Sequence, residues 1–274
     1  MRGRGRLALG GGIVLALCVV ALLAGRLAPA RPGALDLAHE WQGPTAAHPL
    51  GTGDDGLDVS TEILYGARVS LLVGLLAVAL AGSFGTVLGA VAGYAGGAVD
   101  LFVMRLVDVL LAFPGLLFAI LLVALLGPSL FGLVFSLSAT AWVSYARLAR
   151  GQVLSLRDRD FVLAARGLGA SPARIVFRHL VPNLLGPILI QATFGIPGAI
   201  LAEAALSFLG LGVPPGTPSW GALVDQGASH LLDAPHVALF GGAAIALAVL
   251  GFNLLGEELR DRLDSRSRAG PSAP

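Results

Sequence analysis

The chain contains no lysine, and its eighteen basic residues are all arginine. A phosphate-binding loop of the Walker A type and a Schiff-base lysine are therefore both excluded from this chain. The single cysteine, Cys18, lies in an apolar run, which excludes an internal disulfide framework and a multi-thiolate metal site.

Charged residues are also scarce. They make up 13% of the 274 residues, whereas hydrophobic residues make up 55%. A soluble domain carries about a quarter of its residues as charged side chains. This composition is typical of a protein that lies in a lipid bilayer.

Apolar runs long enough to cross ~30 Å of hydrocarbon occur at six places: 7–25, 69–94, 102–126, 129–146, 184–209 and 236–255. We therefore predict an all-α integral membrane protein with six transmembrane helices. We expect residues 1–68 to hold an anchor helix and an extracytoplasmic segment, 69–256 to form the transmembrane core and 257–274 to be a cytoplasmic tail.

Arginine is unevenly distributed along the chain. Three arginines precede the first run, seven lie between the fourth and fifth runs, and four follow the last run. Because arginine-rich connections are retained in the cytosol, we expect both termini and the fourth connection to be cytoplasmic. The acidic segment 26–68 would then face outward.

The first apolar run has a second interpretation. The arginines at 2–6, the apolar stretch and Ala28-Pro29-Ala30 also resemble a cleavable signal peptide. The apolar core is longer than such a signal usually has, which favours a retained membrane anchor.

Glycine and proline residues inside the apolar runs predict close helix packing and helix kinks. Four glycines at four-residue spacing share one helix face, which predicts close packing against another helix; they are Gly85, Gly89, Gly93 and Gly97. Prolines at 114, 187 and 197 are expected to kink the third and fifth spans.

Residues 160–183, DFVLAARGLGASPARIVFRHLVPN, form a polar, arginine-rich island between apolar runs. We predict that Asp160 caps a short helix that ends near Gly169. Ser171 followed by proline predicts the N-cap of a second short helix, and Pro182 is expected to close it. Two short helices joined at a glycine hinge would form a rigid elbow, suited to docking into a groove on another protein.

The spacing in this island resembles the cytoplasmic loop of ATP-binding-cassette (ABC) importer permeases. Their motif is Glu-Ala-Ala, three residues, Gly, nine residues, Ile, one residue and Leu-Pro. Ala164, Ala165, Gly169 and Pro182 fall at motif positions, while Leu163, His179 and Val181 depart from the motif. The resemblance implies a coupling-helix loop between spans four and five.

Four further strings are similar to the second permease subunit of dipeptide, oligopeptide and nickel importers: HPLGTGDDGLDV (48–59), ILYGARVSLLVG (63–74), LSFLGLGVPPGTPSWG (206–221) and NLLGEELRDRLD (253–264). The resemblance implies a bacterial inner-membrane subunit that assembles with a sister permease, two cytosolic ATPase subunits and an extracytoplasmic solute-binding protein. Its expected cargo is di- or oligopeptides, with nickel or another small solute as the alternative. Apart from membrane lipid, no further partner, and no nucleic acid, is expected.

Under this hypothesis the ATPase-coupling residues are Ala164, Ala165, Arg166, Gly169, Ser171, Arg174, Arg178 and Pro182. The three arginines would meet acidic or helix-terminal groups on the ATPase, or would serve only to retain the loop in the cytosol.

Charged residues inside the spans are candidates for a second role. Arg105 and Asp108 share a helix face and are expected to pair or to face protein, in a subunit contact or in the transport path. Glu203 lies among small residues and would either make an interhelical hydrogen bond or line the outer part of the path.

No motif for bond-breaking chemistry accompanies these features. The five histidines lack metal-ligand spacing, and neither H-E-x-x-H nor G-x-S-x-G occurs. We expect no catalytic residue, cofactor or metal.

A self-sufficient secondary transporter is the rival hypothesis; it would need an inverted repeat or intramembrane ion ligands. A membrane enzyme is a more distant alternative.

Overall fold

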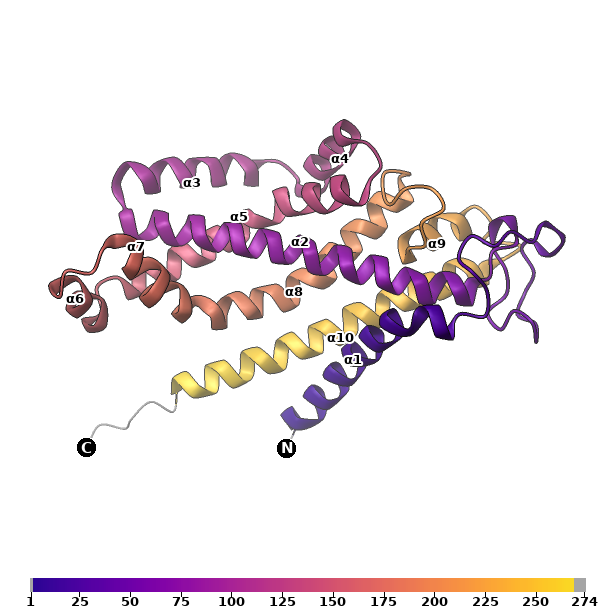
Figure 1. Cartoon of the computed structure of the whole chain (residues 1–274), viewed down its shortest axis with the longest axis horizontal. Helices are drawn as coiled ribbons and strands as arrows, with labels where there is room; N and C mark the ends of the chain where they lie inside the picture. The colour runs from indigo at the N-terminus through magenta and orange to yellow at the C-terminus, as the bar shows by residue number, and fades with distance from the viewer. Residues whose placement is uncertain (1, 269–274) are drawn as a thin grey trace.

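The computed structural model describes residues 2–268, with side chains for residues 5–263. This part of the chain is helical and contains no β-strand, only an isolated bridge between Thr52 and Asp58. The α-helices are α1 (Arg2–Leu27), α2 (Val59–Ala95), α3 (Gly97–Ala112), α4 (Gly115–Leu126), α5 (Leu130–Leu156), α6 (Asp160–Gly167), α7 (Pro172–Arg174), α8 (Val181–Phe208), α9 (Trp220–Ala228) and α10 (Pro235–Arg268) (Figure 1). Shorter elements are the 3-10 turns η1 (Leu37–His39) and η2 (Asp54–Gly56) and the π-helical segment η3 (Ile175–Leu180).

Several helices are long and apolar enough to cross a bilayer. Among the described residues these are Gly5–Leu27, Val59–Ala95, Pro172–Phe208 and Pro235–Leu263. Helices α3 and α4 add a fifth candidate only if they count as one broken span, because their axes meet at 91°. The fold is therefore that of a multi-pass membrane protein with four or five candidate spans by length and composition.

Two predicted spans differ from the observed helices. Helix α2 begins at Val59, earlier than expected, because the Asp58 carboxylate accepts a hydrogen bond from the Thr61 backbone N–H at 2.7 Å and caps the helix. The predicted third span is not continuous, since the chain leaves helical geometry at Phe113 and Pro114. The ring of Pro114 and its missing N–H account for the break.

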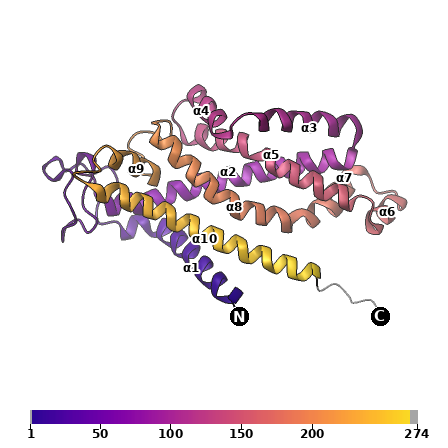
Figure 2. The ribbon, with the colours of Figure 1, turned by 180° about the vertical axis from the view of Figure 1, so that it is seen from behind.

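Helix α10 reaches Arg268, so most of the expected polar tail is helical, and its last six residues, 269–274, lie outside the described part. Figure 2 shows α10 beside α1 from behind, and the two helices are in contact. Gly10 allows this approach, because a Cβ there would lie 2.8 Å from Leu254 Cβ.

The centre of the bundle is a seam between α2 and α5. A Cβ added at Gly85 would lie 2.3 Å from the Trp142 carbonyl oxygen, and one at Gly89 would lie 2.1 Å from that of Ala146. Gly93 also faces α5, with the Arg150 carbonyl oxygen at 3.1 Å. The predicted close packing is confirmed for these three glycines. Gly97 differs, because it begins α3 and a Cβ there would meet no atom within 4 Å.

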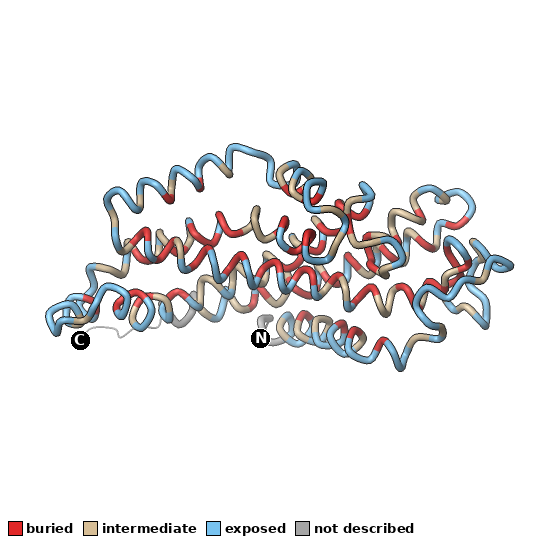
Figure 3. The backbone as a smooth tube through the Cα atoms, turned by 45° about the horizontal axis from the view of Figure 1, so that its top comes forward, coloured by how far each residue is buried: buried red, intermediate tan, exposed pale blue. Residues whose placement is uncertain are grey.

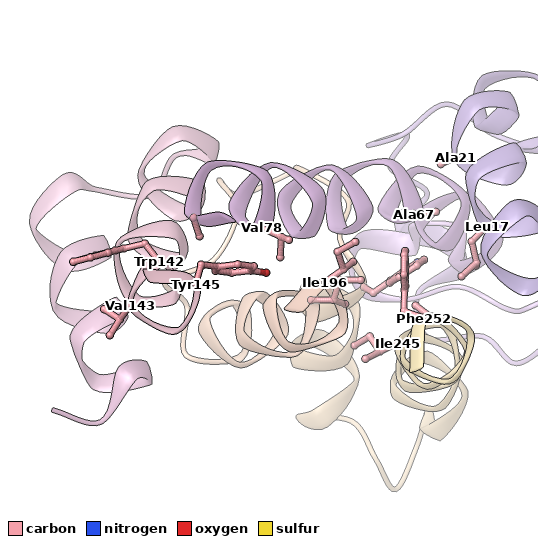
Figure 4. Close-up of a cluster of buried hydrophobic side chains, with 14 of the residues drawn as sticks. Leu17, Ala21, Ala67, Val78, Trp142, Val143, Tyr145, Ile196, Ile245 and Phe252 are labelled. Carbon is pink, nitrogen blue, oxygen red and sulfur yellow. The ribbon is translucent and has the colours of Figure 1, made fainter. Parts of the chain in front are cut away.

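The main hydrophobic cluster joins several helices across this seam. Figure 4 shows Leu17 from α1, Trp142 and Tyr145 from α5, Ile196 from α8 and Phe252 from α10. Buried positions lie on the faces between helices, whereas α3 runs along the outside with only Val103 and Val107 buried (Figure 3). Burial against neighbouring helices therefore fixes the bundle, and its outer surface stays apolar.

The two ends of the molecule differ in structure. Helices α6 and α7 lie at one end, and the connections of residues 28–58 lie with α9 at the other (Figure 1). At the α9 end, the His48 ring contacts the Asp58 carboxylate at 2.9 Å, and the His236 ring contacts the Thr52 carbonyl oxygen at 3.1 Å. These contacts hold the connection between α1 and α2 against the N-terminal ends of α2 and α10.

Candidate functional site

The elbow of residues 160–183 consists of α6, a glycine hinge and the beginning of a longer helical segment. Ser171 is the N-cap, since its hydroxyl accepts a hydrogen bond from the Arg174 backbone N–H at 3.4 Å, and Pro172 follows at the first helical positions. Gly169 has φ +78°, a conformation in which a Cβ would be strained. The predicted cap and the predicted hinge are both confirmed.

Two details of the predicted elbow are wrong. Arg159, without a side-chain bond, occupies the N-cap position of α6, and Asp160 lies in its first turn. There its negative charge interacts favourably with the positive end of the helix dipole, and its side chain does not cap a backbone N–H group.

Pro182 does not close the second helix, because the chain stays helical from Pro172 to Phe208. The π-helical segment η3 accommodates the proline: the Val181 N–H bonds back five residues to the Val176 carbonyl oxygen. Pro182 then falls in the first turn of α8, where its missing N–H is tolerated. The second arm of the elbow is therefore continuous with a membrane-length helix.

The inner face of the elbow is anchored in the bundle. Val162 of α6 and Ile175 and Leu180 of η3 are fully buried. They form one cluster with Ala90 of α2 and with residues of α5. Because α8 also contributes to this cluster, displacement of the elbow would act on α2, α5 and α8.

The outer face of the elbow is exposed and partly apolar. Leu168 is 89% exposed at the hinge, and Phe161, Leu163 and Phe177 are also exposed. Exposed apolar side chains that gather on one segment mark a surface for contact with another protein or with lipid. Sequence reasoning missed this feature, although a leucine between two glycines in a polar stretch was a usable signal.

The small residues of the motif lie on both sides of this surface. Ala164 is exposed, whereas Ala165 is half-buried against the elbow's own cluster. A charge at position 165 would therefore disturb the chain itself, and Ala164 is the cleaner position for testing a contact with a partner.

The elbow arginines differ in their surroundings. The guanidinium of Arg166 lies over the Tyr94 ring, 5.7 Å from its centroid, at the end of α2. Arg174 and Arg178 are exposed. Within the described residues, none of these three arginines forms an ion pair with a carboxylate. Their charges are therefore available to a partner, while Arg166 also helps to hold α6 against α2.

Glu203 lies at the junction of three helices and is completely buried. The hydroxyl of Ser70 on α2 donates to its carboxylate at 3.1 Å, and that of Ser207, one turn along α8, donates at 2.8 Å. The Trp220 backbone N–H donates to Ser70 at 3.3 Å, so the network links α2, α8 and α9.

Arg105 and Asp108 do not pair with each other. Asp108 pairs with Arg147 of α5 at 3.2 Å, and both side chains are more than half exposed. The stronger contact between α3 and α5 is one that sequence reasoning missed: Arg150 holds both oxygens of Asp100, at 2.5 and 2.6 Å. Arg105 is exposed and makes no ion pair among the described residues. The charges of α3 thus fasten this outer helix to α5.

A helical bundle with several membrane-length helices and an anchored, outward-facing elbow defines a multi-pass membrane protein. The chain belongs to the family described as binding-protein-dependent transport system inner membrane component, whose model matches residues 85–269.

Bacterial relatives match most of the chain. It is 42% identical over 257 residues to the dipeptide transport system permease protein DppC of Alkalihalophilus pseudofirmus, covering 94% of this chain and 84% of that protein. It is 40% identical over 225 residues to the oligopeptide transport system permease protein OppC of Bacillus subtilis, covering 82% and 74%. It is 42% identical over 228 residues to the glutathione transport system permease protein GsiD of Pectobacterium atrosepticum, covering 83% and 76%.

Proposed function

We propose that this chain is one of two permease subunits of an ATP-driven importer for dipeptides and oligopeptides. The observation that carries the proposal is its 42% identity, over 94% of its length, to a dipeptide transport permease. Its partners would be a sister permease, two cytosolic ATPase subunits and an extracytoplasmic solute-binding protein. The sister permease would complete the transport path, and ATP would be hydrolysed on the ATPase subunits.

The elbow is the part that would receive the movement of the ATPase. Its face with Ala164, Leu168 and Gly169 is exposed and would be free to enter a groove on a partner. Its second arm continues into α8 without a break, and its first arm shares a buried cluster with α2 and α5. A push on the elbow would therefore be transmitted to the helices in the centre of the bundle, since packed helices move as units.

We further propose six spans: α1, α2, the broken pair α3–α4, α5, α8 and α10. Helix α5 has 27 residues, which corresponds to about 40 Å of helix, enough to cross the hydrocarbon core. Both termini and the elbow would lie in the cytosol, as the arginine distribution favours. Residues 28–58 and α9 would then face the solute-binding protein.

The cargo is tested in a strain that lacks the gene. We expect loss of growth when a dipeptide is the only source of a required amino acid, and restoration by the parent gene, because the path for peptides would be missing. Growth on the free amino acid is the control. Normal peptide uptake together with lost nickel uptake would contradict the peptide assignment and support the alternative cargo.

A further inference from the structure

The hydroxyl of Tyr145 on α5 is buried and makes no hydrogen bond with another described residue. The residue is 2% exposed, and its Oη has no partner among the described residues. An unpaired hydroxyl in an apolar interior costs free energy. We therefore expect that a hydrogen-bond partner is supplied from outside the chain. Figure 4 shows the ring reaching from α5 into the space between Val78 of α2 and Ile196 of α8.

Tyr145 lines a cavity of about 230 Å³ between α2, α5 and α8. The polar lining consists of Thr140, Ser144, Tyr145 and Gln191, and Gly195 and Gly198 leave the α8 wall open. A Cβ at Gly195 would lie 2.7 Å from Tyr145 Oη, so only glycine leaves the hydroxyl room. Ser144 and Gly198 are exposed at the mouth of the cavity.

The position of the cavity favours a transport path over a lipid contact. Its lining residues lie within α2, α5 and α8, outside the first and last turns of these helices. Hydroxyl and amide groups at that depth face protein or a polar path, because hydrocarbon cannot satisfy their hydrogen bonds. A cavity open to the surface here is therefore suited to a polar solute that crosses the membrane.

The chemistry of the lining defines the class of ligand. No charged residue lines the cavity. Tyrosine and serine hydroxyls and the glutamine amide both donate and accept, which matches the C=O and N–H groups of a peptide bond. A volume below ~300 Å³ accommodates part of a substrate and not all of it.

We propose that this cavity transiently binds a backbone amide group of the transported peptide, with the Tyr145 hydroxyl as donor to its carbonyl oxygen. The proposal rests on the proposed function and adds a contact residue for the substrate. Charged peptide termini would not be held here, because the lining offers no counter-charge and burying an unpaired charge is unfavourable.

The first test uses the complete importer in vesicles and replaces Tyr145 with phenylalanine. Tyr145→Phe removes the hydroxyl only, and Tyr65→Phe makes the same change outside the cavity. We expect kcat/KM for dipeptide uptake to fall about three- to tenfold in Tyr145→Phe, as for one lost hydrogen bond, and to be unchanged in Tyr65→Phe. Complex recovery should be equal in all three, because the hydroxyl supports no contact within the chain.

The second test measures occupancy directly in a chain in which serine replaces Cys18. Ser144→Cys lies at the cavity mouth, and Ser83→Cys is a matched exposed position that does not line it. We expect a transported dipeptide, with ATP, to slow alkylation by a small thiol reagent at position 144 and not at position 83.

Equal alkylation rates at position 144 with and without peptide, or normal uptake by Tyr145→Phe, would overturn the cavity assignment while leaving the proposed function intact. If the parent importer moves no peptide, the proposed function and the cavity assignment both fail.

Discussion

At the level of single residues, a hydrogen-bond network around Glu203 links α2, α8 and α9. Its carboxylate accepts from Ser70 and Ser207, and Ser70 in turn accepts from the Trp220 backbone N–H. The sequence left two roles open for this glutamate, an interhelical bond or a path-lining charge. Its complete burial and its serine partners support the first role in the isolated subunit.

Substitutions at Glu203 separate these two roles. Glu203→Ala should lower stability by about 2–4 kcal/mol, because it leaves a cavity and removes the acceptor of two buried hydroxyls. Glu203→Gln keeps an acceptor oxygen and should retain most of the stability and the transport activity. The midpoint of thermal unfolding of the purified complex and peptide uptake are the measurements, with Glu257→Ala, an exposed glutamate, as the control. Normal unfolding but abolished transport in Glu203→Gln would show that the charge acts in the path.

At the scale of elements, the sequence predicted features that depend on local chemistry. Ser171 before a proline predicted the cap, Gly169 predicted the hinge, and the glycine period predicted close helix packing, which occurs between α2 and α5. Each follows from the geometry of one turn or one helix face. The close packing predicted from the glycine period does not occur at Gly97, because α2 ends at Ala95 and α3 begins at Gly97.

Features that depend on neighbours could not be predicted in this way. The π-helical segment before Pro182 lets the helix continue, and nothing in a residue-by-residue propensity indicates it. Asp108 pairs with Arg147 and not with Arg105, because Arg147 on α5 lies within reach of α3. The Glu203 network also joins residues more than a hundred positions apart, such as Ser70 and Glu203.

The proposed role of α5 as a span makes an element-scale prediction. With Cys18 replaced by serine, single cysteines at Ser129 and Ser155 mark the two ends of α5, and one at Ala170 marks the elbow. We expect a membrane-impermeant thiol reagent to label position 129 from outside intact cells and positions 155 and 170 only after the membrane is opened. Labelling of positions 129 and 155 from the same side would show that α5 does not cross, and labelling of 170 from outside would contradict a cytosolic elbow.

At the scale of the whole molecule, the elbow and the Tyr145 cavity lie on the same helices. The segment from Pro172 to Phe208 carries the second arm of the elbow at one end and the cavity residue Gln191 in its middle. The other cavity walls belong to α2 and α5, which share the cluster under the elbow. A displacement imposed at the elbow would therefore change the helices that surround the cavity.

The central claim is that the elbow couples ATP hydrolysis to peptide movement, and Gly169→Val in the reconstituted importer tests it. Gly169 and Gly97 both have positive φ, and a Cβ at either would meet no atom within 4 Å of the chain. Valine at either position therefore carries a similar backbone strain, about 1 kcal/mol, but only position 169 lies within the elbow. Ala164→Asp and Ala98→Asp form a second matched pair of exposed positions.

The measurement is the uptake of labelled dipeptide by vesicles that contain both permeases, both ATPase subunits and the binding protein, together with ATP hydrolysis and complex recovery. The account predicts that Gly169→Val and Ala164→Asp insert normally but lose the ATPase subunits or transport about tenfold less peptide per ATP, as for the loss of one favourable contact in the coupling step. Gly97→Val and Ala98→Asp should transport like the parent. Assembly and transport at the parent's level in both elbow variants would contradict the account, because residues 160–183 would then be a plain connection between two spans.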